Sequence, residues 1–174
     1  MSSLKLTLKA WPVIALATIG LCYLTQLVAQ WFGIELPDQA NIEIVKRYAG
    51  WNKTFLILCA QVLVLMPALE ELIFRLLLFK LPVKWAGKHE RGSGVLAALT
   101  KTAPRAIFSS ALFSAAHYLA QPFPDSAFIA LFFFGLAQCW LYRKTDRLWC
   151  VVLNHSLFNL TNLILVFALP ESAH

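Results

Sequence analysis

The stretch "MPALEELIFRLLLFK", residues 66–80, places two glutamates and an arginine inside a run that is otherwise apolar. An ionised side chain at the centre of a membrane helix costs about 2.5 to 3.5 kcal/mol on insertion scales. Glu70, Glu71 and Arg75 must therefore be paired with one another, used for a function, or both. The polar residues of the other apolar segments help to decide between pairing and function.

Long apolar runs recur throughout the 174 residues, and the mean hydropathy of +0.66 is well above that of a soluble domain. The pattern predicts an all-α fold, a polytopic membrane bundle that forms one domain over residues 1–174. Five membrane-spanning helices are predicted, at about 11–33, 54–81, 103–120, 126–142 and 148–169. The second is longer than a perpendicular span requires, so we expect it to tilt, or Pro67 to kink it.

The first predicted span follows two lysines, Lys5 and Lys9, as the apolar segment of a signal peptide would. However, its apolar stretch runs for about twenty residues, and no Ala-x-Ala cleavage site closes it. We therefore expect a retained anchor helix. Residues 1–53 are then an additional N-terminal helix with an outer loop, ahead of a motif-bearing core at about 54–165.

The net charge of +6 follows the predicted loops. Ten of the fifteen basic residues lie at the N-terminus, in the 80–101 loop and in the 143–147 loop. Basic loops face the cytoplasm, so the N-terminus is predicted to be cytoplasmic and the C-terminus to lie outside. This distribution indicates contact with the lipid bilayer and its anionic headgroups, and it argues against nucleic acid as a partner.

The four cysteines all lie within apolar spans and form no CxxC pair. This distribution favours buried free thiols over a disulfide or a metal site.

Four further polar side chains stand out inside the apolar spans. His117 lies in "FSSALFSAAHYLA", and Asn154, His155 and Asn159 lie in "VVLNHSLFNLTNL". Polar groups at bilayer depth normally face a protein interior or a water-filled cavity. Together with the glutamates, these residues favour one shared site over separate helix–helix hydrogen bonds. His155 and Asn159 are four apart and share a helix face, as do Phe113 and His117, which places an aromatic ring beside that imidazole.

Helical spacing distinguishes the two glutamates. Glu71 and Arg75 are four residues apart with the acid first, so we expect them to form an ion pair. Glu70 is turned by about 100° from Glu71 around the helix and can face elsewhere. One glutamate is therefore expected to neutralise the arginine, and the other to be available for chemistry.

Depth in the membrane can be estimated by counting residues from the cytoplasmic end of each span. At 1.5 Å per residue, Glu70 and Asn159 lie at about 17 Å, His155 at about 10 Å and His117 at about 20 Å. Four residues from three helices are thus predicted to converge near the bilayer midplane.

This combination of side chains suits the hydrolysis of an amide. A carboxylate within reach of an imidazole is a general-base pair that can activate water. A second imidazole and a side-chain amide are donors that can stabilise an oxyanion. The signatures of other intramembrane chemistries, GxSxG, HExxH and GxGD, do not occur.

Three short patterns follow one another along the chain, each within an apolar span: "EELIFR" at 70–75, "FSAAH" at 113–117 and "HSLFN" at 155–159. They resemble the EExxxR, FxxxH and HxxxN motifs of the CAAX prenyl protease and bacteriocin-processing (CPBP, Abi-type) family of intramembrane endopeptidases. Gly135, in the approach to the third motif, also matches the family's usual sequence. The resemblance covers about residues 54–165.

The resemblance implies an all-helical intramembrane peptidase with its active site at bilayer depth, acting on a membrane-associated protein or peptide. Glu70 would activate water together with His117, and His155 and Asn159 would form the oxyanion hole.

In the same family pattern Glu71 and Arg75 would hold the architecture, and Phe113 would support His117. The chain is shorter than the eukaryotic CAAX-cleaving members, which favours a bacterial, inner-membrane member with a peptide or sorting-type substrate.

Two alternatives remain open. No cofactor is expected, but Glu70, His117 and His155 have the ligand types of a zinc site, so the same protease could be metal-dependent. From a different class, a non-catalytic membrane immunity or partner-binding protein could use the polar cluster for helix packing.

Overall fold

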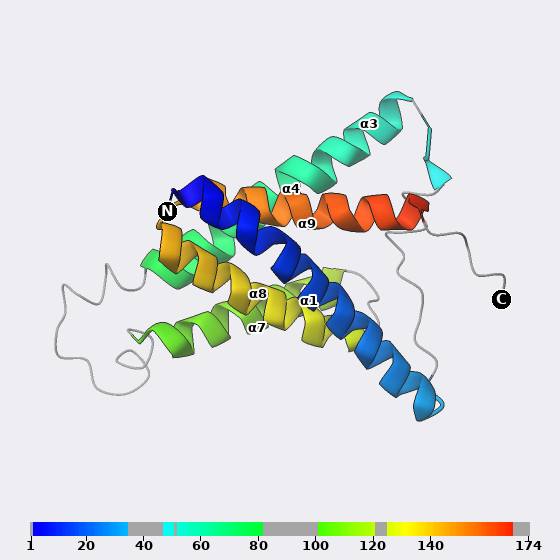
Figure 1. The fold of residues 1–174 in the computed structure, drawn as a ribbon, viewed down its shortest axis with the longest axis horizontal. Coiled ribbons are helices and arrows are strands. Elements are labelled where there is room, and N and C mark those ends of the chain that lie inside the picture. Colours follow the sequence, from blue (N-terminus) through cyan, green and yellow to red (C-terminus); the bar gives the residue numbers. More distant parts are fainter. Residues whose placement is uncertain (1, 35–46, 51, 82–100, 121–124, 169–174) are drawn as a thin grey trace.

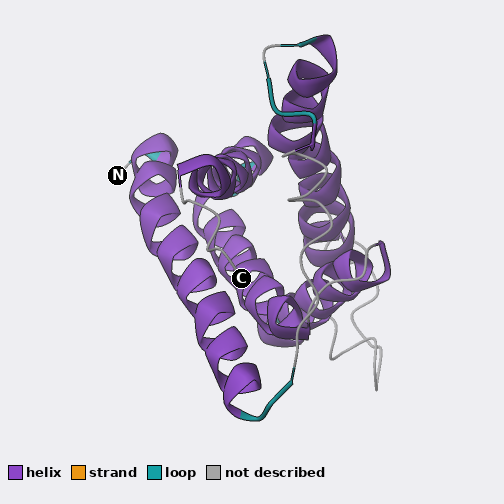
Figure 2. Ribbon diagram, turned by 90° about the vertical axis from the view of Figure 1, so that its right-hand side faces the viewer, coloured by secondary structure: helices purple, strands orange, loops and turns teal. Residues whose placement is uncertain are grey.

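The computed structural model describes residues 2–34, 47–50, 52–81, 101–120 and 125–168. Every regular element in these ranges is a helix (Figure 2), which confirms the predicted all-α fold. The helices are α1 (Ser3–Trp31), α3 (Lys53–Ala60), η1 (Gln61–Leu65), α4 (Met66–Glu71), η2 (Leu72–Lys80), α7 (Thr102–Ala120), α8 (Asp125–Thr145) and α9 (Leu148–Ala168).

The elements α3, η1, α4 and η2 follow one another without a break and form one long helix, in which η1 and η2 are π-helical segments. Together with α1, α7, α8 and α9, this helix accounts for the five predicted spans. Neighbouring helices in the chain run in opposite directions between the two ends of the bundle (Figure 1).

Side-chain caps explain where two of the helices begin. The hydroxyl of Ser2 accepts a hydrogen bond from the backbone N–H of Lys5 at 3.3 Å, at the start of α1. The side-chain oxygen of Asn52 accepts from the N–H of Phe55 at 2.9 Å, at the start of α3. Each cap satisfies one of the N–H groups that the first turn of a helix leaves without a partner.

Three helices in the described part of the chain are long and apolar enough to cross a membrane: Ser3–Trp31, Lys53–Lys80 and Leu148–Ala168. The predicted spans 103–120 and 126–142 correspond to α7 and α8, which are less apolar. In α7 the polar residues Arg105, Ser109, Ser110 and Ser114 are buried. These side chains face protein instead of lipid, which is how a helix of this composition fits the bundle.

Helix α8 lies in contact with both α1 and α7 (Figure 1). Its approach to α7 depends on Gly135, because a Cβ atom there would lie 2.9 Å from Ser110 Cβ and 3.0 Å from Ser110 Cα. Such distances are too short for any residue but glycine without displacing the backbone of α7. The neighbouring Phe134 is fully buried, and its ring lies 5.9 Å from that of Phe113 on α7.

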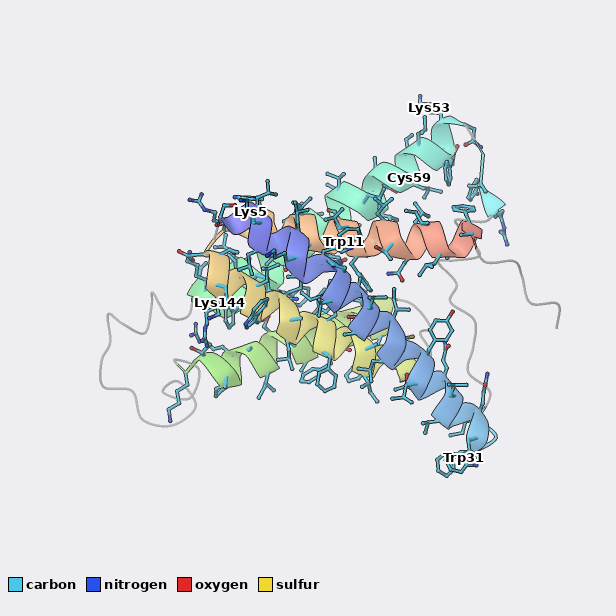
Figure 3. The ribbon with its side chains drawn as sticks, in the orientation of Figure 1. Lys5, Trp11, Trp31, Lys53, Cys59 and Lys144 are labelled. Carbon is cyan, nitrogen blue, oxygen red and sulfur yellow. The ribbon has the colours of Figure 1, made fainter. Side chains whose placement is uncertain are left out.

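The additional N-terminal helix, α1, packs on α8 and α9. Trp11, which Figure 3 labels, donates its indole N–H to the hydroxyl of Thr161 on α9 at 3.2 Å. The first helix is therefore part of the bundle.

Candidate active site

Glu71 and Arg75 form the ion pair that their four-residue spacing predicted. Arg75 Nε lies 3.0 Å from Glu71 Oε2, and both side chains are fully buried. Desolvating two charges is unfavourable, and their mutual attraction offsets that penalty only where further hydrogen bonds satisfy both groups.

Arg75 gains such contacts from α7. Its Nη1 donates to Ser109 Oγ at 3.2 Å, and that hydroxyl donates to the backbone carbonyl of Phe74 at 2.6 Å. The guanidinium also lies over the ring of Phe113, 5.1 Å from its centroid, in a cation–π contact. Arg75 thus ties the second long helix to α7.

Glu71 has a second partner, which comes from α9. Its Oε1 lies 2.9 Å from His155 Nδ1. A carboxylate only accepts hydrogen bonds, so the proton of this bond belongs to Nδ1, and Nε2 is the atom that His155 presents to other groups. Glu71 therefore holds the orientation of His155 as well as the charge of Arg75.

Glu70 faces both histidines. Its Oε2 lies 3.7 Å from His117 Nε2 and 3.7 Å from His155 Nε2. These distances exceed those of direct hydrogen bonds and are in the range where a water molecule can bridge two groups. Water has two hydrogens, so it can donate to two of these three acceptor atoms at once. The Glu70 side chain is 17% exposed, in contrast to the fully buried Glu71, so the helical repeat has separated the two carboxylates as predicted.

His117 is oriented by its own helix. Its Nδ1 lies 2.9 Å from the carbonyl oxygen of Phe113, which only accepts, so Nδ1 carries the proton of that bond. In the neutral ring, Nε2 is then the basic atom, and it faces Glu70. The Phe113 ring packs beside both imidazoles, with centroids 4.5 Å from His117 and 5.9 Å from His155.

Asn159 makes a contact that residue counting did not predict. Its Nδ2 donates to the backbone carbonyl of Val62 at 2.9 Å. In η1 the N–H of Met66 bonds to Gln61, five residues back, so the next donor in that ladder would be Pro67, which has no N–H. The carbonyl of Val62 thus has no donor in the π-helical ladder, and it accepts the hydrogen bond from Asn159.

The depth estimate needs one correction. It placed Asn159 level with Glu70 and His155 about 7 Å nearer the cytoplasmic end. Instead, His155 is the residue of α9 that faces Glu70, and Asn159 lies against Val62, two turns before Glu70. Counting assumed straight, parallel α-helices, whereas the second long helix contains π-helical segments.

Two contributors to the site were not predicted. Ser109 bonds to Arg75, and the ring of Phe134 lies 5.0 Å from that of His155. Ser109 precedes Phe113 and His117 at intervals of four, so its position on their helix face was a usable signal. No signal in the sequence pointed to Phe134 beyond its place next to Gly135.

The donor types of Glu70, His117 and His155 are those of a zinc site. Within the described ranges, however, no group of three or more His, Cys, Asp or Glu side chains is arranged to hold a metal ion. Metal dependence stays the alternative for these three residues, and no step through a metal is derived from them.

The fold and the site together define a helical membrane protein with a carboxylate and two imidazoles gathered between its helices. The sequence model of the family described as type II CAAX prenyl endopeptidase, Rce1-like, matches residues 52–161. The chain therefore belongs to the Rce1-like family, a family of membrane proteases. The match includes the second long helix, α7, α8 and the site-bearing part of α9. Comparisons with curated proteins and with solved structures found no match.

Proposed function

We propose that the protein is a glutamate-dependent intramembrane endopeptidase that hydrolyses a peptide bond in a membrane-associated protein or peptide. The observation that carries this proposal is the position of Glu70 Oε2, 3.7 Å from the Nε2 atoms of both His117 and His155. A water molecule bonded there has the Glu70 carboxylate as its base and the imidazole of His117 beside it to orient it.

Glu70 is the general base in this proposal. Its carboxylate takes a proton from the water molecule while His117 Nε2 accepts the second hydrogen bond of that water and orients it. The water oxygen then forms a bond to the carbon of the scissile amide. Because Phe113 holds the proton on His117 Nδ1, the basic nitrogen is kept toward the water.

Attack on the amide creates negative charge on its carbonyl oxygen. In this proposal His155 stabilises the oxyanion as a donor through Nε2, and the Glu71 oxygen at Nδ1 holds the ring in that orientation. We propose Asn159, one turn beyond His155 on the same face of α9, as a second donor, since its amide nitrogen has two hydrogens and Val62 takes one. Protonated Glu70 then gives its proton to the leaving nitrogen, the C–N bond breaks, and an acid and an amine are released.

Membrane association of the substrate follows from the place of the site. Glu70 lies in a helix apolar enough to cross a membrane, and its side chain is mostly buried. A segment that reaches it must enter the apolar bundle. The test is reconstitution of the purified chain into proteoliposomes with candidate membrane-anchored proteins, followed by mass spectrometry of their termini. New C- and N-termini at one bond are expected, and intact substrates throughout would contradict the proposal.

Replacing Asn159 with alanine is expected to lower kcat by about a hundred- to a thousandfold with little change in KM, the usual effect of losing one oxyanion donor. The loss also leaves the Val62 carbonyl without its donor, which costs about 1 to 3 kcal/mol of stability. Cleavage kinetics and thermal unfolding of the same sample measure both effects.

The matched control is Asn162→Ala, because Asn162 lies on the same helix but donates to the carbonyl of Phe158 in its own helix, at 3.1 Å. This variant should keep its turnover. A chelator should leave the parent protein active. Loss of activity with a chelator, restored by one equivalent of zinc, would overturn the donor roles of His155 and Asn159.

We further propose that the N-terminus is cytoplasmic and the C-terminus outside. In support, α1 begins and α9 ends at opposite ends of the bundle, and the basic residues Lys5 and Lys144 lie at the same end (Figure 3). In a bacterial host, alkaline phosphatase fused to the C-terminus should therefore be active and a green fluorescent protein fusion dark. The opposite pattern would show that α7 or α8 does not cross the membrane.

A further inference from the structure

A cavity of about 240 Å³ lies at the end of the bundle where α1 begins, away from the candidate active site. It is bordered by the end of η2, the start of α7 and the end of α8. Among the described residues that line it, three are basic, Lys80, Arg105 and Arg143, and one is acidic, Asp146. This described lining carries a net positive charge.

Arg105 is the unusual member of this lining. The residue is 6% exposed, and its Nε and Nη1 donate to the backbone carbonyls of Lys101 and Phe79, at 3.2 Å and 2.6 Å. Its guanidinium also lies over the Phe79 ring, 5.2 Å from the centroid. All of these partners are uncharged, and no carboxylate in the described ranges forms an ion pair with it.

Arg75 is also buried, but its charge is neutralised by the carboxylate of Glu71, 3.0 Å away. A buried charge without a counter-ion is costly, and proteins rarely keep one. The acid in the cavity, Asp146, already forms an ion pair with Lys80. An anion in the cavity would supply the counter-charge that none of the described residues gives Arg105.

We propose that this cavity binds the phosphate group of an anionic membrane lipid. Arg105 and Arg143 provide guanidinium groups, which match phosphate oxygens through paired N–H donors. Thr102 adds a hydroxyl, and it opens α7, a helix of 19 residues whose first N–H groups favour an anion.

A lipid is favoured over a free phosphate because of the surface around the cavity. The cavity lies at the ends of helices, where headgroups meet the protein, and basic pockets at this level bind such headgroups. About one turn further along, Leu77 on η2 and Ile107 and Phe108 on α7 are exposed apolar side chains. They offer an acyl chain a surface next to the charged cavity.

The test compares thermal unfolding of the full chain in detergent with added phosphatidylglycerol, phosphatidylcholine or inorganic phosphate. Phosphatidylglycerol should raise the unfolding midpoint and bind in native mass spectrometry, and phosphatidylcholine should not. Equal stabilisation by both lipids would overturn the charge argument. Equal stabilisation by inorganic phosphate would show that the source is a free anion and overturn the lipid assignment.

Substitutions of the arginines that line the cavity test whether the lipid binds there. Arg105→Gln and Arg143→Gln should each weaken phosphatidylglycerol binding by about tenfold, because each removes a charged donor. Arg143 is exposed, so its variant keeps the test valid if Arg105→Gln folds poorly. Lys144→Gln is the control, with the same change of charge on the next residue, which does not line the cavity. Equal losses in Arg143→Gln and Lys144→Gln would mean a general surface-charge effect and overturn the proposal.

Discussion

Glu70→Gln should lower turnover by about a hundred- to ten-thousandfold, the usual contribution of a general base, while leaving the protein folded. Glutamine keeps the size of the side chain but cannot take a proton from water. Folding should tolerate the change because, in the part of the chain that the structure describes, the ion-pair partners of the Glu70 carboxylate are the two imidazoles, both at 3.7 Å. Cleavage kinetics in proteoliposomes, with thermal unfolding of the same preparation, measure the two effects.

The result also separates the enzyme from a membrane protein that uses the polar cluster only for packing. Normal expression and stability with lost cleavage supports the catalytic role of Glu70. Lost folding would instead indicate a structural role. An active Glu70→Gln enzyme would mean that another group activates the water.

The second large effect is expected for Glu71→Ala, and it falls on stability. The substitution leaves the buried Arg75 without its counter-ion, a fault that costs about 3 to 5 kcal/mol when one partner of a buried pair is removed. It also removes the acceptor of His155 Nδ1, so activity should fall together with stability. Expression yield and the thermal unfolding midpoint in detergent are the measurements.

A double variant distinguishes the two duties of Glu71. Glu71→Gln with Arg75→Met removes both charges at once, and replacing a buried ion pair by uncharged groups of similar volume is often neutral. Stability should therefore recover, whereas activity should stay low because the Glu71 carboxylate that holds His155 Nδ1 is gone. A stable, inactive Glu71→Ala beside an active Glu70→Ala would show that the roles of the two glutamates are reversed.

Much of the fold follows from local properties of the chain. Apolar length predicted the five helices, and their observed bounds lie within a few residues of the prediction except at the start of α1. The four-residue spacing predicted the Glu71–Arg75 ion pair, and the angle between adjacent residues separated Glu70 from Glu71. These features depend on the helical repeat alone, so they can be read from sequence.

Contacts between helices could not be predicted from the helical repeat. The bond from His155 to Glu71 joins residues 84 positions apart, and it arises from the relative rotation of two helices. Asn159 reaches Val62 because a π-helical segment followed by Pro67 leaves one carbonyl over, a departure from the α-helical repeat on which the depth estimate relied.

By itself, the sequence determined which helices form, which of their faces carry polar groups and that two carboxylates point in different directions. The tertiary structure decided that both imidazoles face Glu70, which partner Glu71 holds besides Arg75, and that Arg105 is buried beside a cavity with no counter-charge among the described residues. The physical reason is that helical periodicity is a local property of the backbone. The distance between two side chains on different helices depends instead on the rotation, inclination and register of both helices, which are set by packing throughout the bundle.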